Sequence, residues 1–398
     1  NINLISRENL TGISVVHAYN AEEYQEDKFE KANDVLMRTQ LFNQRAMALL
    51  MPAVGLAMNA LSLTIYWVGA AIVNRVSATD LAGRISTFGD IVVFGTYATY
   101  IIMSLMMLVM ILVLLPMAQV SAVRINEVLD APISLHEGKM TEAPEQGTVE
   151  FRDVSFRYPS SSGDVLEHVS FRANKGETIA FIGATGSGKT TLVSLAARFY
   201  DATEGQVLID GQDVRSYSFD ALYDRIGYVT QRAIVFAGDV RSNVLFGESS
   251  APQDDESVQR ALSLAQATEF VDKLPGKLDA PIAQAGANVS GGQKQRLSIA
   301  RALARKPEIL IFDDSFSALD YRTDASLRAG LARELSDTTC LIVAQRIGTI
   351  RHADRIVVLD EGRVAGIGTH DELMKNCGVY REIAMSQLSA AELEKEGV

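Results

Sequence analysis

The chain has 398 residues, which is long enough for two or three domains. With 47% hydrophobic and 22% charged residues, it has the composition of a folded protein. The net charge of −12 and the pI near 5.0 argue against a nucleic-acid binder, which would normally carry a basic stripe. Cys340 and Cys377 fit no disulfide or metal spacing, which favours a reduced, cytosolic setting for that half of the chain.

Two long uncharged stretches follow a helix-favouring N-terminal segment at 6–45. Residues 46–73 and 91–123 contain no Asp, Glu, Lys or Arg. A helix of about 20 apolar residues crosses a bilayer core of about 30 Å, so we predict two membrane spans, at about 46–73 and 89–116. The alternative is a pair of buried core helices, but uncharged runs of this length are rare in soluble proteins.

The charges beside these stretches predict their orientation. The segment 21–45 carries four basic residues: Lys28, Lys31, Arg38 and Arg45. The connection at 75–87 carries only Arg75 and Arg84, which favours a cytoplasmic start and a cytoplasmic remainder. Two spans make a poor membrane domain, and the first residue is Asn1 rather than Met. We therefore expect the chain to be an N-terminally truncated fragment.

The pattern changes after a polar stretch at 131–148, which reads as a linker because it contains Pro132 and Pro144. From residue 149 onward, short β-rich runs alternate with helical ones, and this alternation predicts an α/β domain over 149–390. The clearest predicted strands are 178–183, 225–230, 309–314, 340–345 and 355–362.

The stretch FIGATGSGKTT at 181–191 contains G-x-x-x-x-G-K-T between a predicted strand and a helical run, the context that a phosphate-binding loop requires. Its glycines let the backbone turn and aim N–H groups at phosphate oxygens. Lys189 would supply a charge to the β- and γ-phosphates, and the Thr190 hydroxyl would reach Mg²⁺. The expected ATP-binding residues here are Gly183, Thr185, Gly186, Ser187, Gly188, Lys189, Thr190 and Thr191.

A second acidic element supports the same chemistry. The strand ILIFD ends at Asp313, and a P-loop enzyme uses such an aspartate to hold the magnesium shell. The alternative is an ordinary aspartate at a strand end. We therefore expect ATP and Mg²⁺ as cofactors.

A third motif, VSGGQKQRLSIARAL at 289–303, lies between these two. Together the three motifs resemble the nucleotide-binding domain of ABC transporters. Residues 6–23 are similar to the second cytoplasmic loop of ABC exporters, and residues 88–116 to their last transmembrane helix. The resemblance implies an α-helical transmembrane part, with a coupling loop at 1–45 inside a partial domain 1–130, followed by a P-loop α/β nucleotide-binding domain. It also implies that the chain begins after the fourth of six spans.

The resemblance assigns roles one residue at a time. Tyr158 would stack on adenine, with strand packing as the alternative, and Gln231 would contact Mg²⁺, with a polar turn as the alternative. Asp320 would lie at the dimer contact. The magnesium set would be Thr190, Gln231 and Asp313. The signature residues, which would meet the γ-phosphate of ATP held by the partner, are Ser290, Gly291, Gly292 and Gln293.

Three positions depart from the family pattern. Asp314 and Gln345 stand at the catalytic positions where competent members have Glu and His, and Gln284 stands where exporters often have Glu. Aspartate is one methylene shorter, and misplacement by about 1 Å can cost about 10²-fold in rate. Gln345 cannot become cationic. We therefore predict an own site that binds ATP and hydrolyses it slowly, in the degenerate half of a heterodimeric exporter.

The partner prediction follows from the same resemblance, and the substrate prediction follows from the apolar character of the spans. An intact VSGGQ, with Val289 in place of the usual Leu, would serve the second half-transporter's site. A homodimer with slow hydrolysis and a regulatory ATP clamp without transport remain alternatives. The substrate is expected to be a hydrophobic drug or lipid, and Met103, Met106, Met107 and Met110 offer either an adaptable surface or a lipid-facing one. We expect a multi-pass plasma-membrane protein with a cytoplasmic ATP domain, in contact with membrane lipid and not with nucleic acid.

Overall fold

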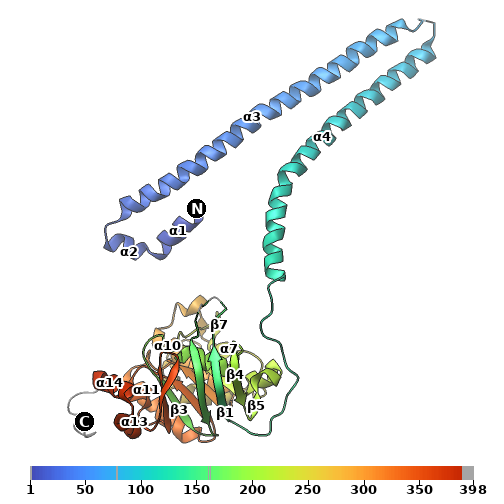
Figure 1. Ribbon diagram of the computed structural model, residues 1–398. Helices are drawn as coiled ribbons and strands as arrows, with labels where there is room; N and C mark the ends of the chain where they lie inside the picture. The colour runs from blue at the N-terminus through green and yellow to red at the C-terminus, as the bar shows by residue number, and fades with distance from the viewer. Residues whose placement is uncertain (1, 78, 160, 162, 388–398) are drawn as a thin grey trace. The chain divides into compact units, whose positions relative to one another are not determined.

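The chain forms two compact units, a helical unit, Asn1–Ala131, and an α/β unit, Pro132–Val398. The computed structural model describes residues 2–77, 79–159, 161 and 163–387 (Figure 1). The five strands predicted from the sequence are present in the α/β unit as β3, β6, β9, β10 and β11, with the bounds given below.

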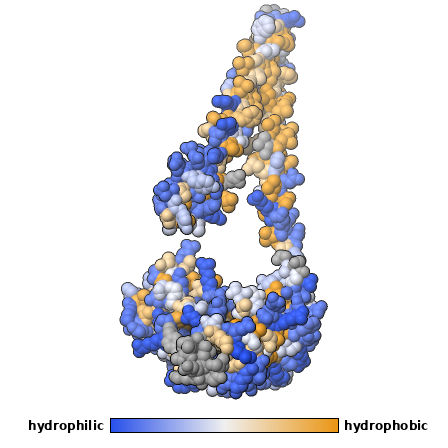
Figure 2. Space-filling view, turned by 60° about the vertical axis from the view of Figure 1, so that its left-hand side comes forward, coloured by the Kyte–Doolittle hydropathy of each residue, from blue (hydrophilic) through white to orange (hydrophobic). Residues whose placement is uncertain are grey.

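The helical unit is dominated by two long helices. Its elements are α1 (Ile2–Thr11), α2 (Ile13–Ala18), α3 (Glu22–Arg75) and α4 (Leu81–Leu129). Both long helices contain a stretch that is long and apolar enough to cross a membrane, and neither stretch is buried within the unit. Figure 2 shows hydrophobic residues gathered along the middle of this hairpin. Each predicted span therefore lies inside a helix that continues beyond it.

Glycines shape the contact between α3 and α4. A Cβ atom added at Gly69 would lie 2.8 Å from the Ile91 side chain, and one at Gly95 would lie 4.0 Å from Ile65 Cγ2. Small residues of this kind let membrane helices approach closely. The hydroxyls of Thr64 and of Thr96 donate to the carbonyl four residues earlier, at 2.8 and 2.9 Å. These polar groups are thus satisfied within their own helices, as a hydrocarbon environment demands.

The α/β unit contains a six-stranded sheet, ordered β12-β11-β3-β10-β9-β6, in which every neighbouring pair except β11–β12 is parallel. A four-stranded antiparallel sheet, β2-β1-β4-β5, and a pair, β7-β8, accompany it. The strands are β1 (Val149–Phe156), β2 (Leu166–Ala173), β3 (Thr178–Ile182), β4 (Glu204–Ile209), β5 (Gln212–Asp213), β6 (Ile226–Val229), β7 (Gly238–Asp239), β8 (Pro281–Ile282), β9 (Ile309–Asp313), β10 (Thr339–Val343), β11 (Arg355–Asp360) and β12 (Arg363–Gly368).

Helices flank these sheets (Figure 1). They are α5 (Lys189–Ala196), η1 (Val214–Ser216), α6 (Phe219–Arg225), α7 (Val240–Val244), α8 (Asp255–Leu264), α9 (Thr268–Asp272), η2 (Lys277–Asp279), η3 (Gln284–Gly286), α10 (Gly291–Ala304), α11 (Tyr321–Glu334), α12 (Ile347–Ile350), α13 (His370–Asn376) and α14 (Gly378–Gln387).

The six-stranded sheet separates two hydrophobic cores. Successive side chains of a strand point to opposite faces. Ile179 and Phe181 of β3 therefore join the core that includes β1, β2 and β4, while Ala180 and Ile182 join the core that includes α8 and α10. Because the central strands are buried on both faces, they read as continuous apolar runs, which is why the sequence revealed them.

The polar segment before β1 is tied to the rest of the α/β unit by hydrogen bonds. Gly138 N donates to Tyr217 O at 2.9 Å, and Thr148 N donates to Asp210 Oδ1 at 2.9 Å. Asp210 is fully buried, and Arg225 Nη1 lies 3.5 Å from its Oδ2. Burial raises the pKa of the Asp210 carboxyl to about 6, although the Thr148 N–H and the Arg225 guanidinium favour its charged form.

Candidate ATP-binding site

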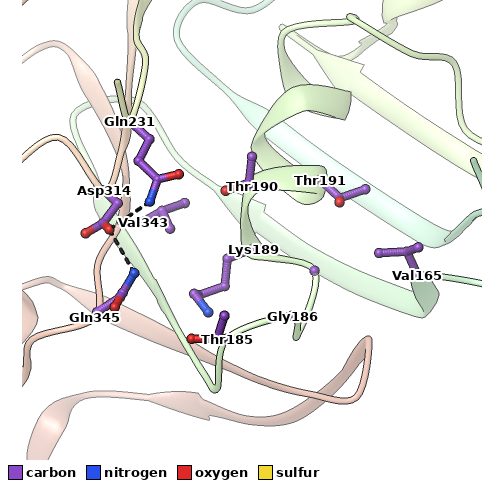
Figure 3. Close-up of a pocket in the computed structure, with 11 residues that line it drawn as sticks. Val165, Thr185, Gly186, Lys189, Thr190, Thr191, Gln231, Asp314, Val343 and Gln345 are labelled. Atoms are coloured by element: carbon purple, nitrogen blue, oxygen red, sulfur yellow. Dashed lines mark hydrogen bonds between the residues drawn. The ribbon is translucent and has the colours of Figure 1, made fainter. Parts of the chain in front are cut away.

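Three segments that carry predicted site residues, the phosphate-binding loop and the segments with Asp314 and Gln345, meet at one edge of the six-stranded sheet. β3, β10 and β9 are parallel neighbours, so the segments that follow them emerge at the same edge. These segments carry the phosphate-binding loop, Gln345 and Asp314. They line a cavity of about 280 Å³ (Figure 3), whose walls are formed by Val165, Thr185, Gly186, Gly188, Lys189, Thr190, Thr191, Gln231, Asp314, Val343 and Gln345.

Two glycines of the loop have no possible substitute. Gly188 has φ 94°, and a Cβ atom there would lie 2.6 Å from Leu166 Cδ2. A Cβ atom at Gly183 would lie 2.1 Å from the carbonyl oxygen of Leu359. Glycine is needed at Gly188 for the left-handed backbone and at Gly183 for the close approach of the Leu359 carbonyl. The loop therefore keeps the shape that aims its N–H groups at phosphate oxygens.

Lys189 begins α5 and is held over the loop. Its Nζ donates to Gly183 O at 2.8 Å, to Ala184 O at 2.7 Å and to Ser187 Oγ at 3.2 Å. Burial lowers the pKa of this ammonium group. The charges of Asp314 and Asp313 favour the charged form of this ammonium group, and phosphate oxygens would add further negative charge, so the geometry fits a nucleotide phosphate beside Lys189.

Oxygen atoms suited to magnesium surround Asp313, which is 3% exposed. Thr190 Oγ1 donates to Asp313 Oδ1 at 2.9 Å, and Tyr228 Oη donates to Oδ2 at 3.4 Å. Burial raises the pKa of the Asp313 carboxyl. Within the described part of the chain, no group of three His, Cys, Asp or Glu side chains could hold a metal ion. Mg²⁺ commonly binds one or two carboxylates together with substrate phosphates, so the residues present fit it.

Asp314 adopts a left-handed backbone conformation, with φ 47°, which Asp accepts more readily than Glu. Its Oδ2 accepts from Gln345 Nε2 at 2.9 Å and from Gln231 Nε2 at 3.3 Å (Figure 3). Burial raises the pKa of its carboxyl. Both of these amides are neutral. One oxygen of the carboxylate is therefore engaged by groups that can neither accept a proton nor carry a charge.

Other predicted residues lie outside the cavity lining. Tyr158 Oη is 3.1 Å from Thr191 Oγ1, and its ring packs edge-on against Tyr200 at 5.2 Å. Ser290 caps α10, where its Oγ accepts from Gln293 N at 3.3 Å and its N–H donates to Gln293 Oε1 at 2.8 Å. Asp320 caps α11 through Thr323 N at 2.9 Å. Adenine stacking, signature contacts with a partner and the dimer contact remain predictions.

Sequence reasoning missed Tyr228, Val165 and Val343. Tyr228 lies in the predicted strand 225–230, but its role depends on β6 lying next to β9. Val343 is the residue opposite Asp313 in the β9–β10 ladder, and Val165 immediately precedes β2. An aromatic hydroxyl in a strand that follows a helix gave no signal of its own, because strand order is not visible in one sequence.

The fold and this cavity define a P-loop nucleotide-binding unit on a chain that also carries membrane-type helices. Residues 166–317 match the family model described as ABC transporter, and residues 1–123 match that of the ABC transporter transmembrane region. The chain therefore belongs to the ABC transporters, as a membrane protein with a cytoplasmic ATP-binding domain.

Several relatives agree with this assignment. An uncharacterized ABC transporter ATP-binding protein of Mycobacterium tuberculosis is 40% identical over 98% of this chain and 66% of its own length. An ATP-dependent lipid A-core flippase of Aromatoleum aromaticum is 34% identical over 99% of this chain and 64% of its own length. The solved structure of a bacterial Atm1-family ABC exporter with ATP bound is similar with a TM-score of 0.80, 29% identity, and coverage of 97% and 66%. The chain thus spans about two thirds of these relatives.

Proposed function

We propose that this chain is part of an ABC exporter subunit that binds MgATP and couples ATP binding and hydrolysis to the movement of a hydrophobic substrate across the membrane. The cavity at the end of β3, β9 and β10 supports nucleotide binding. The similarity to an exporter structure along nearly the whole chain supports the coupling. When bound, the magnesium ion would neutralise phosphate charge near Thr190, Asp313 and the side-chain oxygen of Gln231.

The observation that carries the finer proposal is the pairing of Asp314 Oδ2 with the amides of Gln231 and Gln345, at 3.3 and 2.9 Å. A general base needs a free, well-aimed lone pair within reach of the attacking water. The shorter Asp314 side chain points one oxygen at two amides, and Gln345 cannot provide a cation near the γ-phosphate. This chain's own site therefore retains ATP and hydrolyses it slowly.

The signature segment supports a complementary role. Ser290 and Gln293 form a reciprocal cap at the start of the 14-residue helix α10, which satisfies their own N–H groups. Gly291 and Gly292 contribute further first-turn N–H groups, which have no acceptor within the helix. Such a helix end suits an anion. In a two-chain transporter it would complete the partner's ATP site, so hydrolysis would occur at the site that borrows Ser290–Gln293.

The substrate class is proposed from two observations. The described parts of the spans carry exposed apolar side chains, including Met103, Met107 and Met110. The Aromatoleum aromaticum relative is named a lipid A-core flippase. A lipid is therefore the favoured substrate, with a hydrophobic drug as the alternative.

ATP turnover by the purified chain alone, compared with a mixture containing its second half-transporter, tests this proposal. The chain alone should bind MgATP with little turnover, and the mixture should hydrolyse about 10²-fold faster, the cost expected of one misplaced catalytic group. The assignment of a degenerate site would be contradicted if the chain alone hydrolysed ATP as fast as the mixture and if Asp314→Ala left both rates unchanged. Lys375→Ala, an exposed substitution on α13, is the matched control.

A further inference from the structure

The loop that carries Gln345 is held from its far side by the C-terminal helix. Gln387, the last residue of α14, donates from Nε2 to Gln345 O at 2.7 Å. Its Oε1 accepts from Ile347 N at 2.9 Å. One side-chain amide thus satisfies a backbone acceptor and a backbone donor two residues apart, which we call the Gln387 clasp.

The two parts joined by the clasp are each anchored in the α/β unit. On the loop side, Ile347 is fully buried. On the helix side, Tyr380 and Ala384 of α14 are fully buried, and the Tyr380 hydroxyl shares a 2.7 Å hydrogen bond with His370 Nδ1. Because α14 is positioned by its own core contacts, its last residue can set the loop. Loss of the Gln387 amide would leave the helix in place.

The clasp leads directly into the ATP cavity. The backbone of Gln345 is fixed by Gln387, and its side chain donates to Asp314 Oδ2 at 2.9 Å. The same oxygen accepts from Gln231. A continuous series of hydrogen bonds therefore runs from α14 through Gln345 and Asp314 to Gln231, all within one compact unit.

We propose that Gln387 is a positioning residue for the ATP site, and that α14 sets, through the Gln387 clasp, where the Gln345 amide lies relative to the γ-phosphate. This inference rests on the proposed role of the cavity in binding ATP. Gln387 touches no reacting group, so its effect reaches the nucleotide only through Gln345.

Two substitutions separate the two hydrogen bonds of the clasp. Gln387→Ala removes both. Gln387→Glu keeps the acceptor for the Ile347 N–H but places a carboxylate against the Gln345 carbonyl. Ser386→Ala is the matched control, because among the described residues the neighbouring Ser386 hydroxyl donates to Ile383 O of its own helix, at 2.7 Å.

The first measurement is amide hydrogen exchange of residues 344–350 in the full-length transporter without nucleotide. Gln387→Ala should raise the exchange rate of the Ile347 amide by roughly threefold to tenfold, as the loss of a net hydrogen bond predicts. Gln387→Glu and Ser386→Ala should leave that rate near the unmodified value. An unchanged rate in Gln387→Ala would overturn the inference.

The second measurement is MgATP affinity, followed with a fluorescent ATP analogue. Gln387→Ala should weaken binding by about threefold to tenfold, and the change should disappear when Gln345→Ala is already present, since residues acting through one another are not additive. Faster exchange with unchanged affinity, or an equal loss in both backgrounds, would refute the positioning role. If the unmodified transporter binds no ATP, the proposed function fails while the exchange comparison still decides the clasp.

Discussion

The phosphate loop and the Asp314–Gln345 pair line the same cavity, but only the loop has all the residue types that its expected role requires. The loop has glycines at its strained positions, a lysine directed at its own carbonyls, and a threonine bonded to Asp313. The Asp314–Gln345 pair has a short carboxylate and two neutral amides. Under the function proposed above, the loop would bind the nucleotide and the Asp314–Gln345 pair would support only slow hydrolysis. The comparison therefore separates the residues expected to govern ATP affinity from those expected to govern turnover.

The comparison requires that both regions rest on one stable scaffold, and Asp210 tests that scaffold. A carboxyl whose folded pKa is raised stabilises the fold below its unfolded pKa and loses that contribution as pH rises through the folded value. With a folded pKa of about 6 against an ordinary 3.8, the α/β unit should lose up to about 3 kcal/mol of stability between pH 4 and 7 from this group. Asp210→Asn should remove this pH dependence.

Thermal unfolding of the purified protein and of Asp210→Asn, scanned from pH 4 to 7, measures the difference. The stability advantage of the unmodified protein should shrink as pH rises. A constant difference across this range would show that Asp210 has no raised pKa. ATP affinity and turnover at one pH should both stay near the values of the unmodified protein, since the substitution lies in neither region.

Lys189→Ala should weaken ATP binding at the phosphate loop and leave the Asp314–Gln345 pair unchanged. A lysine that donates to charged phosphate oxygens contributes about 1.5–3 kcal/mol, so MgATP affinity should fall by roughly ten- to a hundredfold. Equilibrium binding of a labelled ATP analogue measures the loss. Lys375→Ala should bind normally. Retained affinity in Lys189→Ala would mean that the loop is not the nucleotide site.

Changing Asp314→Glu together with Gln345→His should make the pair competent. Turnover by the chain alone should rise by about tenfold to a hundredfold, with ATP affinity unchanged, because only the positioning of the catalytic groups improves. Steady-state ATPase assays separate kcat from KM. No gain in kcat would count against the idea that these two residues limit hydrolysis.

Asp314→Asn should have the smallest effect. Its side chain keeps an oxygen for the amides of Gln231 and Gln345 but loses the charge that repels the γ-phosphate. Because the bound magnesium ion would neutralise much of the phosphate charge that this carboxylate meets, MgATP binding should tighten only modestly, by about threefold. Titration of the same ATP analogue measures the change. Weaker binding would indicate that the carboxylate assists binding.

The features that could be predicted from the sequence are those that depend on contiguous residues. The phosphate loop, the buried strands and the uncharged helices each leave a local pattern of spacing or hydropathy. Asp313 ends β9 and Gln345 lies two residues after β10, so the parallel pairing of these strands, rather than the sequence, shows that the two residues lie at one edge. The roles implied by family resemblance for Tyr158 and Ser290 remain predictions, since they concern a nucleotide and a partner chain.

The features that the sequence did not predict depend on contacts between residues far apart in the chain. Tyr228 reaches Asp313 only because β6 pairs with β9, and Gln387 reaches Gln345 only because α14 packs beside α12. The polar segment at 131–148 has the composition of a linker, yet Gly138 and Thr148 bond to the α/β unit through backbone groups that composition does not report. Tertiary pairing, not local propensity, decides these features.

The most direct test compares two substitutions in the two-chain transporter. Gly291 has open space around its Cβ position, so Gly291→Asp can fold while placing a negative charge where the partner's γ-phosphate would lie. Steady-state ATPase activity should fall at least about a hundredfold in Gly291→Asp and by less than about twofold in Asp314→Ala. The reverse result, a steep loss in Asp314→Ala with little change in Gly291→Asp, would contradict the account.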